Sequence, residues 1–220
     1  MTALKTLKID FVSDVACPWC AVGLASLERA LERVAGEVQP QLHFQPFELN
    51  PQMGPEGQDV TEHLTQKYGS TAQQQEAARE NIRQRGAAVG FEFRKEGRGR
   101  VWNTFDAHRL LHWAGLQSQE KQHALKKALL MAYHGQGRSS ADAAVLLDAV
   151  EAAGLDRAEA QQVLDTGRYA GEVRKAEQEW LNNGIHAVPS MILNGKWLVQ
   201  GGQSPEVLEQ AIRQAAAESE

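Results

Sequence analysis

The strongest chemical signal in this sequence is a pair of cysteines separated by two residues, Cys17-Pro18-Trp19-Cys20. Paired thiols at this spacing can exchange with the disulfides of other molecules when one of them ionises readily. A helix that begins here would hold the first sulfur among unpaired backbone N–H groups, at the positive end of the helix dipole. Pro18 suits the first position of such a helix. We therefore predict that Cys17 is the nucleophile, that Cys20 resolves the mixed disulfide, and that Trp19 packs beside them.

A metal site and a pair of inert thiols are the competing interpretations of this dithiol. Zinc and iron–sulfur sites need further ligands, and none of the seven histidines shows the paired spacing expected near these cysteines. His108 and His112 lie four residues apart, but the glutamate of the zinc-binding helix motif is missing beside them. A structural disulfide across two residues would add little loop-closure stabilisation. We therefore expect no metal.

The residues around the dithiol predict the elements that position it. Apolar residues alternate over residues 7–11, as in a strand, and the run ends just before the cysteines. Apolar residues at helical spacing then follow over residues 24–34 and stop at Gly36. A second strand is expected over residues 42–47. The chain therefore begins β-α-β.

Strand character returns near the C-terminal end. Residues 191–193 and 197–199 are apolar and flank Asn194-Gly195, a strong signal for a hairpin. Ser204 can then cap a final helix that begins at Pro205. The chain thus ends β-β-α.

The middle of the chain, from about Asp59 to Asn183, has helical periodicity and predicts five or six helices. Candidate N-caps are Asn103 or Thr104, Ser139 or Ser140, and Asp156 with Glu159 as a capping box. A small mixed sheet interrupted by a helical insertion is the α/β architecture that this order implies. We expect one domain from residues 1–57 and 184–220, and a helical domain from residues 58–183.

Composition restricts the partners of the protein. The formal net charge of -5 provides no cationic field for nucleic acid or anionic lipid. No run approaches the roughly 20 apolar residues that span a bilayer, and no signal-type apolar segment follows Met1. We therefore expect no nucleic-acid partner, no membrane association and a cytoplasmic location. The oligomeric state cannot be deduced from these features.

Several spaced motifs together resemble the DsbA-like thioredoxin superfamily. They are the strand before Cys17-Pro18-Trp19-Cys20, the long helical insertion, Val188-Pro189 and the hairpin. The runs Phe11-Val12-Ser13-Asp14-Val15-Ala16 and Asn103-Thr104-Phe105-Asp106-Ala107-His108 look like the FrnE-type cytoplasmic branch. The resemblance implies a thioredoxin fold with a helical insertion, and a thiol-disulfide oxidoreductase or isomerase whose partners are disulfide- or thiol-containing proteins or small thiols.

The same resemblance implies a role for Val188-Pro189. In the family this proline is cis and faces the dithiol, and the backbone of the residue before it pairs with an extended substrate segment, which resembles strand addition. Position alone does not establish a cis bond, because only about 5–6% of X-Pro bonds in folded proteins are cis. Some FrnE-type proteins also carry a second cysteine pair near the C-terminus. This chain contains two cysteines in total, so Cys17 and Cys20 form its single internal redox pair.

Related families leave two other functions open. Kappa-class glutathione transferases and 2-hydroxychromene-2-carboxylate isomerases share this architecture and generally have serine in place of Cys17. A glutathione-dependent transferase or isomerase, with glutathione as co-substrate, is therefore one alternative, and a chaperone-like binding protein is another. No other cofactor is expected.

Three further residues are candidate substrate contacts. Asn103 and His108 match the family's helix that approaches the dithiol, although an N-cap and an ordinary polar helix residue are simpler interpretations. Gln203 precedes the last helix, in a Gly-Gly turn that could close over the site. The basic cluster of Arg94, Lys95, Arg98 and Arg100 could bind an anionic thiol, but a solvated loop is the simpler interpretation.

Overall fold

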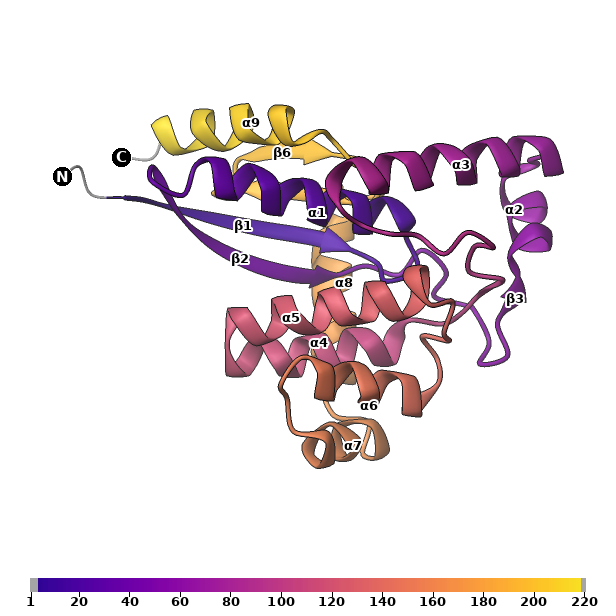
Figure 1. Cartoon of the computed structure of the whole chain (residues 1–220). Coiled ribbons are helices and arrows are strands. Elements are labelled where there is room, and N and C mark those ends of the chain that lie inside the picture. The colour runs from indigo at the N-terminus through magenta and orange to yellow at the C-terminus, as the bar shows by residue number, and fades with distance from the viewer. Residues whose placement is uncertain (1–3, 219–220) are drawn as a thin grey trace.

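A mixed four-stranded sheet organises the fold in the computed structural model, which describes residues 4–218 (Figure 1). Strand β1 (Lys5–Ser13) pairs in parallel with β2 (Val38–Pro46). On its other side β1 pairs antiparallel with β5 (Ser190–Leu193), which pairs antiparallel with β6 (Trp197–Gln200). The strand order is β2-β1-β5-β6, so β1 and β5, which are distant in sequence, lie side by side. The predicted β-α-β beginning and β-β-α end are confirmed.

Helices cover both faces of this sheet. Helices α1 (Pro18–Arg33) and α9 (Pro205–Ala217) share a core with the alternating side chains Leu7, Ile9 and Phe11, which are fully buried. The opposite face carries a smaller cluster around Val12 and Ile192, with Trp180 of α8 (Ala170–Asn182) packed against it. Successive strand residues point to opposite faces, and β1 is buried on both faces from Ile9 to Ser13, whereas Thr6 and Lys8 are exposed.

The long segment between β2 and β5 is mainly helical. Besides α8, it contains α2 (Val60–Tyr68), α3 (Ala72–Val89), α4 (Phe105–Gln117), α5 (Gln119–Leu130), α6 (Ala143–Ala152) and α7 (Arg157–Asp165), with a π-helix over Met131–Gly135. Two short strands, β3 (Gln58–Asp59) and β4 (Arg100–Val101), form a separate ladder. The prediction of five or six helices was wrong because seven α-helices occur here, some of only nine residues.

The helices of this segment have a core of their own. Buried side chains from α4, α5, α6 and α7 form one apolar cluster, which also includes Val15 and Ala16 from the loop before the dithiol. That loop therefore lies where the sheet core and the helical core meet. No helix within residues 4–218 is long and apolar enough to cross a bilayer.

Three of the four predicted N-cap positions are confirmed, at Thr104, Asp156 and Ser204, and the one at Ser139 or Ser140 is wrong. The side chains of Asp156 and Ser204 accept backbone N–H groups at the starts of α7 and α9. Helix α6 is capped by Asp142, whose Oδ1 accepts the Ala144 amide at 2.8 Å, instead of by Ser139 or Ser140. The carboxylate replaces the serines because the chain is still turning at residues 139–141 and reaches helical geometry only after them.

Candidate active site

The dithiol lies where β1 gives way to α1. Cys17 is the N-cap residue of α1 and Pro18 is its first helical residue, so the sulfur of Cys17 is held at the helix N-terminus. The Cys17 amide donates to the Asp14 carbonyl at 3.2 Å, which closes the turn that leads out of the strand. Cys17 is 4% exposed and Cys20 is fully buried one turn further on. Both are free thiols.

The two sulfurs have opposite electrostatic environments. A hydrogen bond from Cys20 is the main factor that lowers the pKa of Cys17, and hydrogen bonds from the amides of Cys20 and Trp19 lower it further. Burial and the charge of Asp14 raise this pKa, but the hydrogen bonds outweigh them. Burial, together with the hydrogen bond and charge of Cys17, raises the pKa of Cys20 well above its usual value. The thiolate of the pair therefore forms first on Cys17, which agrees with the roles predicted for the two residues.

Val188 and Pro189 form the wall opposite the dithiol. The Val188–Pro189 peptide bond is cis, as the family resemblance implies. The Cys17 thiol points toward the Val188 carbonyl, with an Sγ–O distance of 3.6 Å. Pro189 packs closely on α1, since a Cβ added at Gly23 would lie 3.0 Å from Cγ of Pro189. Glycine at position 23 therefore lets the proline approach the helix that carries the cysteines.

Trp19 borders the site on the other side. A Cβ added at Gly202 would lie 2.9 Å from Cε3 of Trp19, so the turn before α9 rests on the indole. Arg85 of α3 donates to the Gly202 carbonyl at 3.0 Å and ties the helical segment to this turn. Gln203 donates its side-chain amide to the Gln200 carbonyl at 2.7 Å, so in this structure it braces the turn. Its assignment as a substrate contact stays a prediction.

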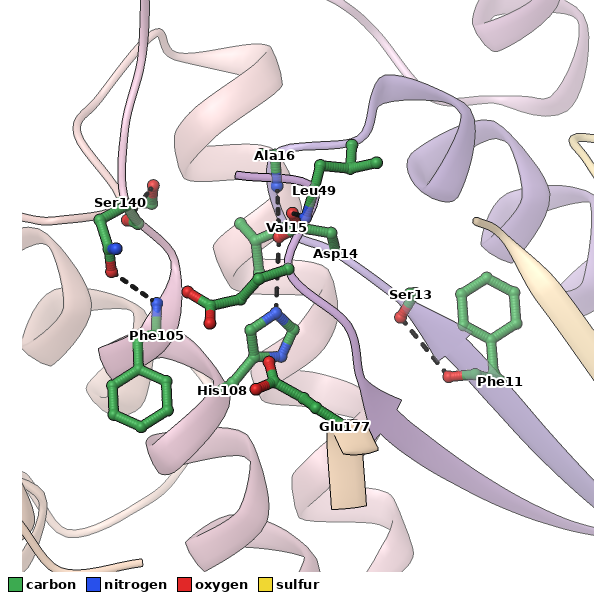
Figure 2. Close-up of polar contacts among 12 residues, drawn as sticks. Phe11, Ser13, Asp14, Val15, Ala16, Leu49, Phe105, His108, Ser140 and Glu177 are labelled. Carbon is green, nitrogen blue, oxygen red and sulfur yellow. Dashed lines mark hydrogen bonds and ion pairs between the residues drawn. The ribbon is translucent and has the colours of Figure 1, made fainter. Parts of the chain in front are cut away.

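A buried carboxylate fixes the loop behind Cys17. Oδ1 of Asp14 accepts the Ala16 amide at 3.1 Å and Oδ2 accepts the Leu49 amide at 2.7 Å (Figure 2). His108 from α4 lies below, with Nε2 3.4 Å from Oδ1 of Asp14. Burial would raise the pKa of Asp14, but His108 and the two amides together hold it below its usual value. Asp14 is therefore a fixed negative charge close to the dithiol.

His108 and Asn103 contribute to this region in different ways. His108 is 2% exposed and faces Asp14, so the structure places it behind the loop that carries Cys17. Asn103 donates to the Met53 carbonyl at 3.1 Å and accepts the Phe105 amide at 2.8 Å, and thus organises the start of α4. The N-cap position itself belongs to Thr104. Substrate contacts by Asn103 and His108 stay predictions.

A second buried charge comes from the helical segment. Lys126 of α5 is fully buried, which lowers the pKa of its ammonium, while the charges of Cys20, Asp14 and Cys17 act in the opposite direction. In return, Lys126 is a factor that lowers the pKa of Cys20. The helical segment thus contributes a buried lysine side chain whose electrostatics are linked to both sulfurs of the dithiol.

Sequence reasoning assigned no role to Asp14 or Lys126. A signal for Lys126 exists, because it falls among Gln122, Leu125, Leu129 and Leu130 on the face of α5 that is buried. A lysine at an otherwise apolar helical position points to a buried charge with a partner. Asp14 gave no comparable signal, since apart from the nearby Ala16 amide its contacts come from the distant residues Leu49 and His108.

Most of the basic cluster is solvated, as its simpler interpretation predicts, because Arg94, Lys95 and Arg100 are exposed. Arg100 donates to the carbonyls of Glu56 and Gly57, and Arg94 pairs with Glu96. Arg98 is half-buried and donates to the Ala16 carbonyl, directly before Cys17. This arginine therefore belongs to the surroundings of the dithiol. Among residues 4–218, no group of three or more His, Cys, Asp or Glu side chains could hold a metal ion.

Fold and site together define a thioredoxin-type protein, with a dithiol at a helix N-terminus, an opposing cis-proline and a helical insertion. The family model described as the DSBA-like thioredoxin domain matches residues 8–213, and the chain belongs to this family. It is similar to a probable DsbA oxidoreductase from Streptomyces coelicolor, with 34% identity over 97% of this chain and 92% of that one, at a TM-score of 0.88. Members of the family are disulfide oxidoreductases.

More distant solved structures share the fold. The cytosolic disulfide reductase DsbM from Pseudomonas aeruginosa, solved with GSH, has 18% identity and a TM-score of 0.60, and the match covers 96% of each chain. A 2-hydroxychromene-2-carboxylate isomerase has 14% identity and a TM-score of 0.67, over 97% of this chain and all of that one. No match was found among the curated proteins.

Proposed function

We propose that this protein catalyses thiol-disulfide exchange through Cys17 and Cys20, as an oxidoreductase or isomerase of disulfide- or thiol-containing proteins and small thiols. The proposal rests on the opposite pKa shifts of the two thiols, lowered for Cys17 and raised for Cys20. Exchange needs one thiolate that attacks the substrate and a second thiol that stays protonated until it resolves the mixed disulfide. The similarity to the probable DsbA oxidoreductase from Streptomyces coelicolor, at 34% identity, supports the same chemistry.

The proposed reaction has two balanced steps. The Cys17 thiolate attacks one sulfur of a substrate disulfide, which forms a mixed disulfide and releases one substrate thiolate. Cys20 then loses its proton and attacks the Cys17 sulfur, which forms the Cys17–Cys20 disulfide and releases the second substrate thiolate. The substrate gains two electrons and the dithiol loses two. The reverse sequence oxidises a substrate dithiol, and stopping at the mixed disulfide allows isomerisation.

The groove around the dithiol suits an extended substrate segment. Val188 and Trp19 are half-buried on either side of Cys17, and the Val188 carbonyl already faces its sulfur. When a substrate sulfur takes the place of the thiol proton, this carbonyl becomes free to accept a backbone N–H from the substrate. Val188, Pro189 and Trp19 would thus hold the mixed disulfide while Cys20 attacks.

Reduction of insulin disulfides with dithiothreitol as donor tests the proposal. The wild-type protein is expected to accelerate precipitation of the insulin B chain, and Cys17→Ser is expected to abolish the acceleration. Lys175→Gln serves as the control, since this side chain is 79% exposed on α8 and pairs with Glu179 at 3.8 Å. Full activity of the Cys17→Ser protein would refute the proposal.

The same variants separate the alternative functions. A glutathione-dependent transferase or isomerase would turn over an aryl substrate with glutathione after both cysteines are replaced by serine. A chaperone-like protein would protect an unfolding client equally well without them. We favour exchange, with glutathione as a small-thiol partner, since the two thiols are buried together and tuned in opposite directions. We place the reaction in the cytoplasm as part of the proposal, and fractionation of cells that express the full chain tests this location.

A further inference from the structure

Helices α2 and α3 form an arm whose apolar side chains lack a core to pack against. Helix α2 buries no side chain, and the only buried residue of the 18-residue α3 is Gly86. Figure 1 shows α2 and the N-terminal half of α3 extending beyond the end of the central sheet. An amphipathic helix normally buries its apolar face. In this arm Val60, Leu64 and Ile82 are only half-buried, so part of their apolar surface remains accessible.

This surface faces a cavity beside the dithiol. The cavity has a volume of about 140 Å³, and its apolar lining comes from Val60, Leu64, Ala78, Ile82, Phe93 and Pro18. A cavity of about 150 Å³ with apolar walls accepts a group the size of benzene. Pro18, which lines the cavity, directly follows Cys17, so a group bound here contacts the residue next to the reacting cysteine.

Arginines surround the same cavity. Arg79, Arg83, Arg94 and Arg98 line it, with Glu96 as the single acidic residue of the lining. Within residues 4–218, the first three pair with Glu76, Glu80 and Glu96 respectively. Arg98 has no carboxylate partner in that part of the chain, and its contacts are the Ala16 carbonyl and the face of the Tyr133 ring. One unneutralised guanidinium thus lies at the edge of an apolar cavity.

We infer that this arm cavity binds a large apolar side chain of a disulfide-containing protein substrate, and that Arg98 pairs with an acidic residue next to that side chain. The inference rests on the proposed function, since it specifies the substrate class of the same site. An extended chain advances about 3.3–3.6 Å per residue, so the apolar residue should lie within about three positions of the substrate cysteine. Glutathione has carboxylates but no apolar side chain to fill the cavity.

Four symmetric peptide disulfides test this inference. They differ only in two residues near the cysteine. These two residues are Phe-Asp, Phe-Lys, Ser-Asp or Ser-Lys. Their reduction by the dithiol form of the protein is measured as kcat/KM, relative to the rate with hydroxyethyl disulfide, which is too small to reach both the dithiol and the cavity. We expect a preference of about tenfold for Phe over Ser, from burial of the ring. A preference of about threefold for Asp over Lys is expected from the pair with Arg98.

Two variants separate the two contacts. Ala78→Trp fills the cavity from an exposed helical position and should reduce the preference for Phe to below twofold while leaving the preference for Asp. Arg98→Gln should remove the preference for Asp, and Arg98→Lys should restore it. Lys175→Gln, on the distant α8, is the control for both and should retain both preferences. Circular dichroism checks that each variant is folded.

The outcomes distinguish failure of the inference from failure of the proposed function. No reduction of hydroxyethyl disulfide by the wild-type protein would refute the proposed exchange activity itself. Normal reduction of hydroxyethyl disulfide, with rates for the four peptides within twofold of one another, would overturn the inference alone. Glutathione disulfide reacting faster than the Phe-Asp peptide would also overturn it, because that ligand leaves the cavity empty.

Discussion

His134 makes the stability of the folded protein depend on pH in a way that can be calculated. This residue of the π-helix is 3% exposed, and its Nε2–H donates to the Val15 carbonyl at 2.8 Å, in the loop before the dithiol. Burial lowers the pKa of its imidazole from 6.5 to about 3, and the charge of Arg98 contributes in the same direction. The ring is therefore neutral in the folded protein at all pH values above about 3.

Acid should destabilise the protein through this residue. Between pH 6.5 and about 3 the unfolded chain binds a proton on His134 that the folded protein does not bind, so the free energy of unfolding decreases as the pH falls. The gap of about 3.5 pH units corresponds to about 5 kcal/mol at 1.36 kcal/mol per unit. At pH 4 about 3 kcal/mol of this is already lost relative to pH 7.

Urea unfolding at pH 7, 5.5 and 4 measures this loss. In His134→Gln the side-chain amide can still donate to the Val15 carbonyl but does not titrate. The free energy of unfolding of this variant should therefore fall by about 3 kcal/mol less than that of wild type between pH 7 and pH 4. His186→Gln, at an exposed position, is the matched control for removal of one histidine. Equal losses in wild type and His134→Gln would refute the reasoning, as would an NMR titration of the His134 ring near pH 6.5.

Two charge substitutions test the electrostatics of the dithiol. In Asp14→Asn, one buried backbone N–H loses its acceptor, which should lower the unfolding free energy by about 2–4 kcal/mol. The same change should lower the pKa of Cys17, because the Asp14 charge raises it. Thiolate absorbance near 240 nm, measured against pH, tests this, and an unchanged midpoint would contradict it. Lys126→Met should raise the pKa of Cys20 further and slow the second step of exchange. A stopped-flow rate of mixed-disulfide resolution equal to wild type would contradict the role given to Lys126.

The dithiol and the outer elements of the fold could be predicted because their signals are local. Alternation before Cys17, helical spacing after it and the Asn194-Gly195 turn each lie within a few residues of the element they specify. The same holds for the caps at Asp156 and Ser204. The cap of α6 was wrong because the sequence pattern pointed to Ser139 or Ser140, whereas the backbone reaches helical geometry only after Asp142.

The surroundings of the dithiol could not be predicted in this way, because they come from distant parts of the chain. Lys126 and Asp14 act on the same two sulfurs although more than a hundred residues separate them in sequence. Arg98 belongs to a Gly-rich basic loop that looks solvated in sequence, yet its guanidinium reaches Ala16. The position of Pro189 opposite Cys17 followed from family resemblance, since nothing near either residue indicates that they meet.

Trapping of the mixed disulfide tests the central claim, that Cys17 attacks and Cys20 resolves. Cys20→Ser and Cys17→Ser proteins are each mixed with a peptide disulfide at pH 7, and the intact mass is followed over time. We predict rapid gain of one peptide mass by Cys20→Ser, located at Cys17, and little adduct on Cys17→Ser, because the remaining Cys20 is buried with a raised pKa. Adduct formation on Cys20 at a rate equal to that on Cys17 would contradict the account.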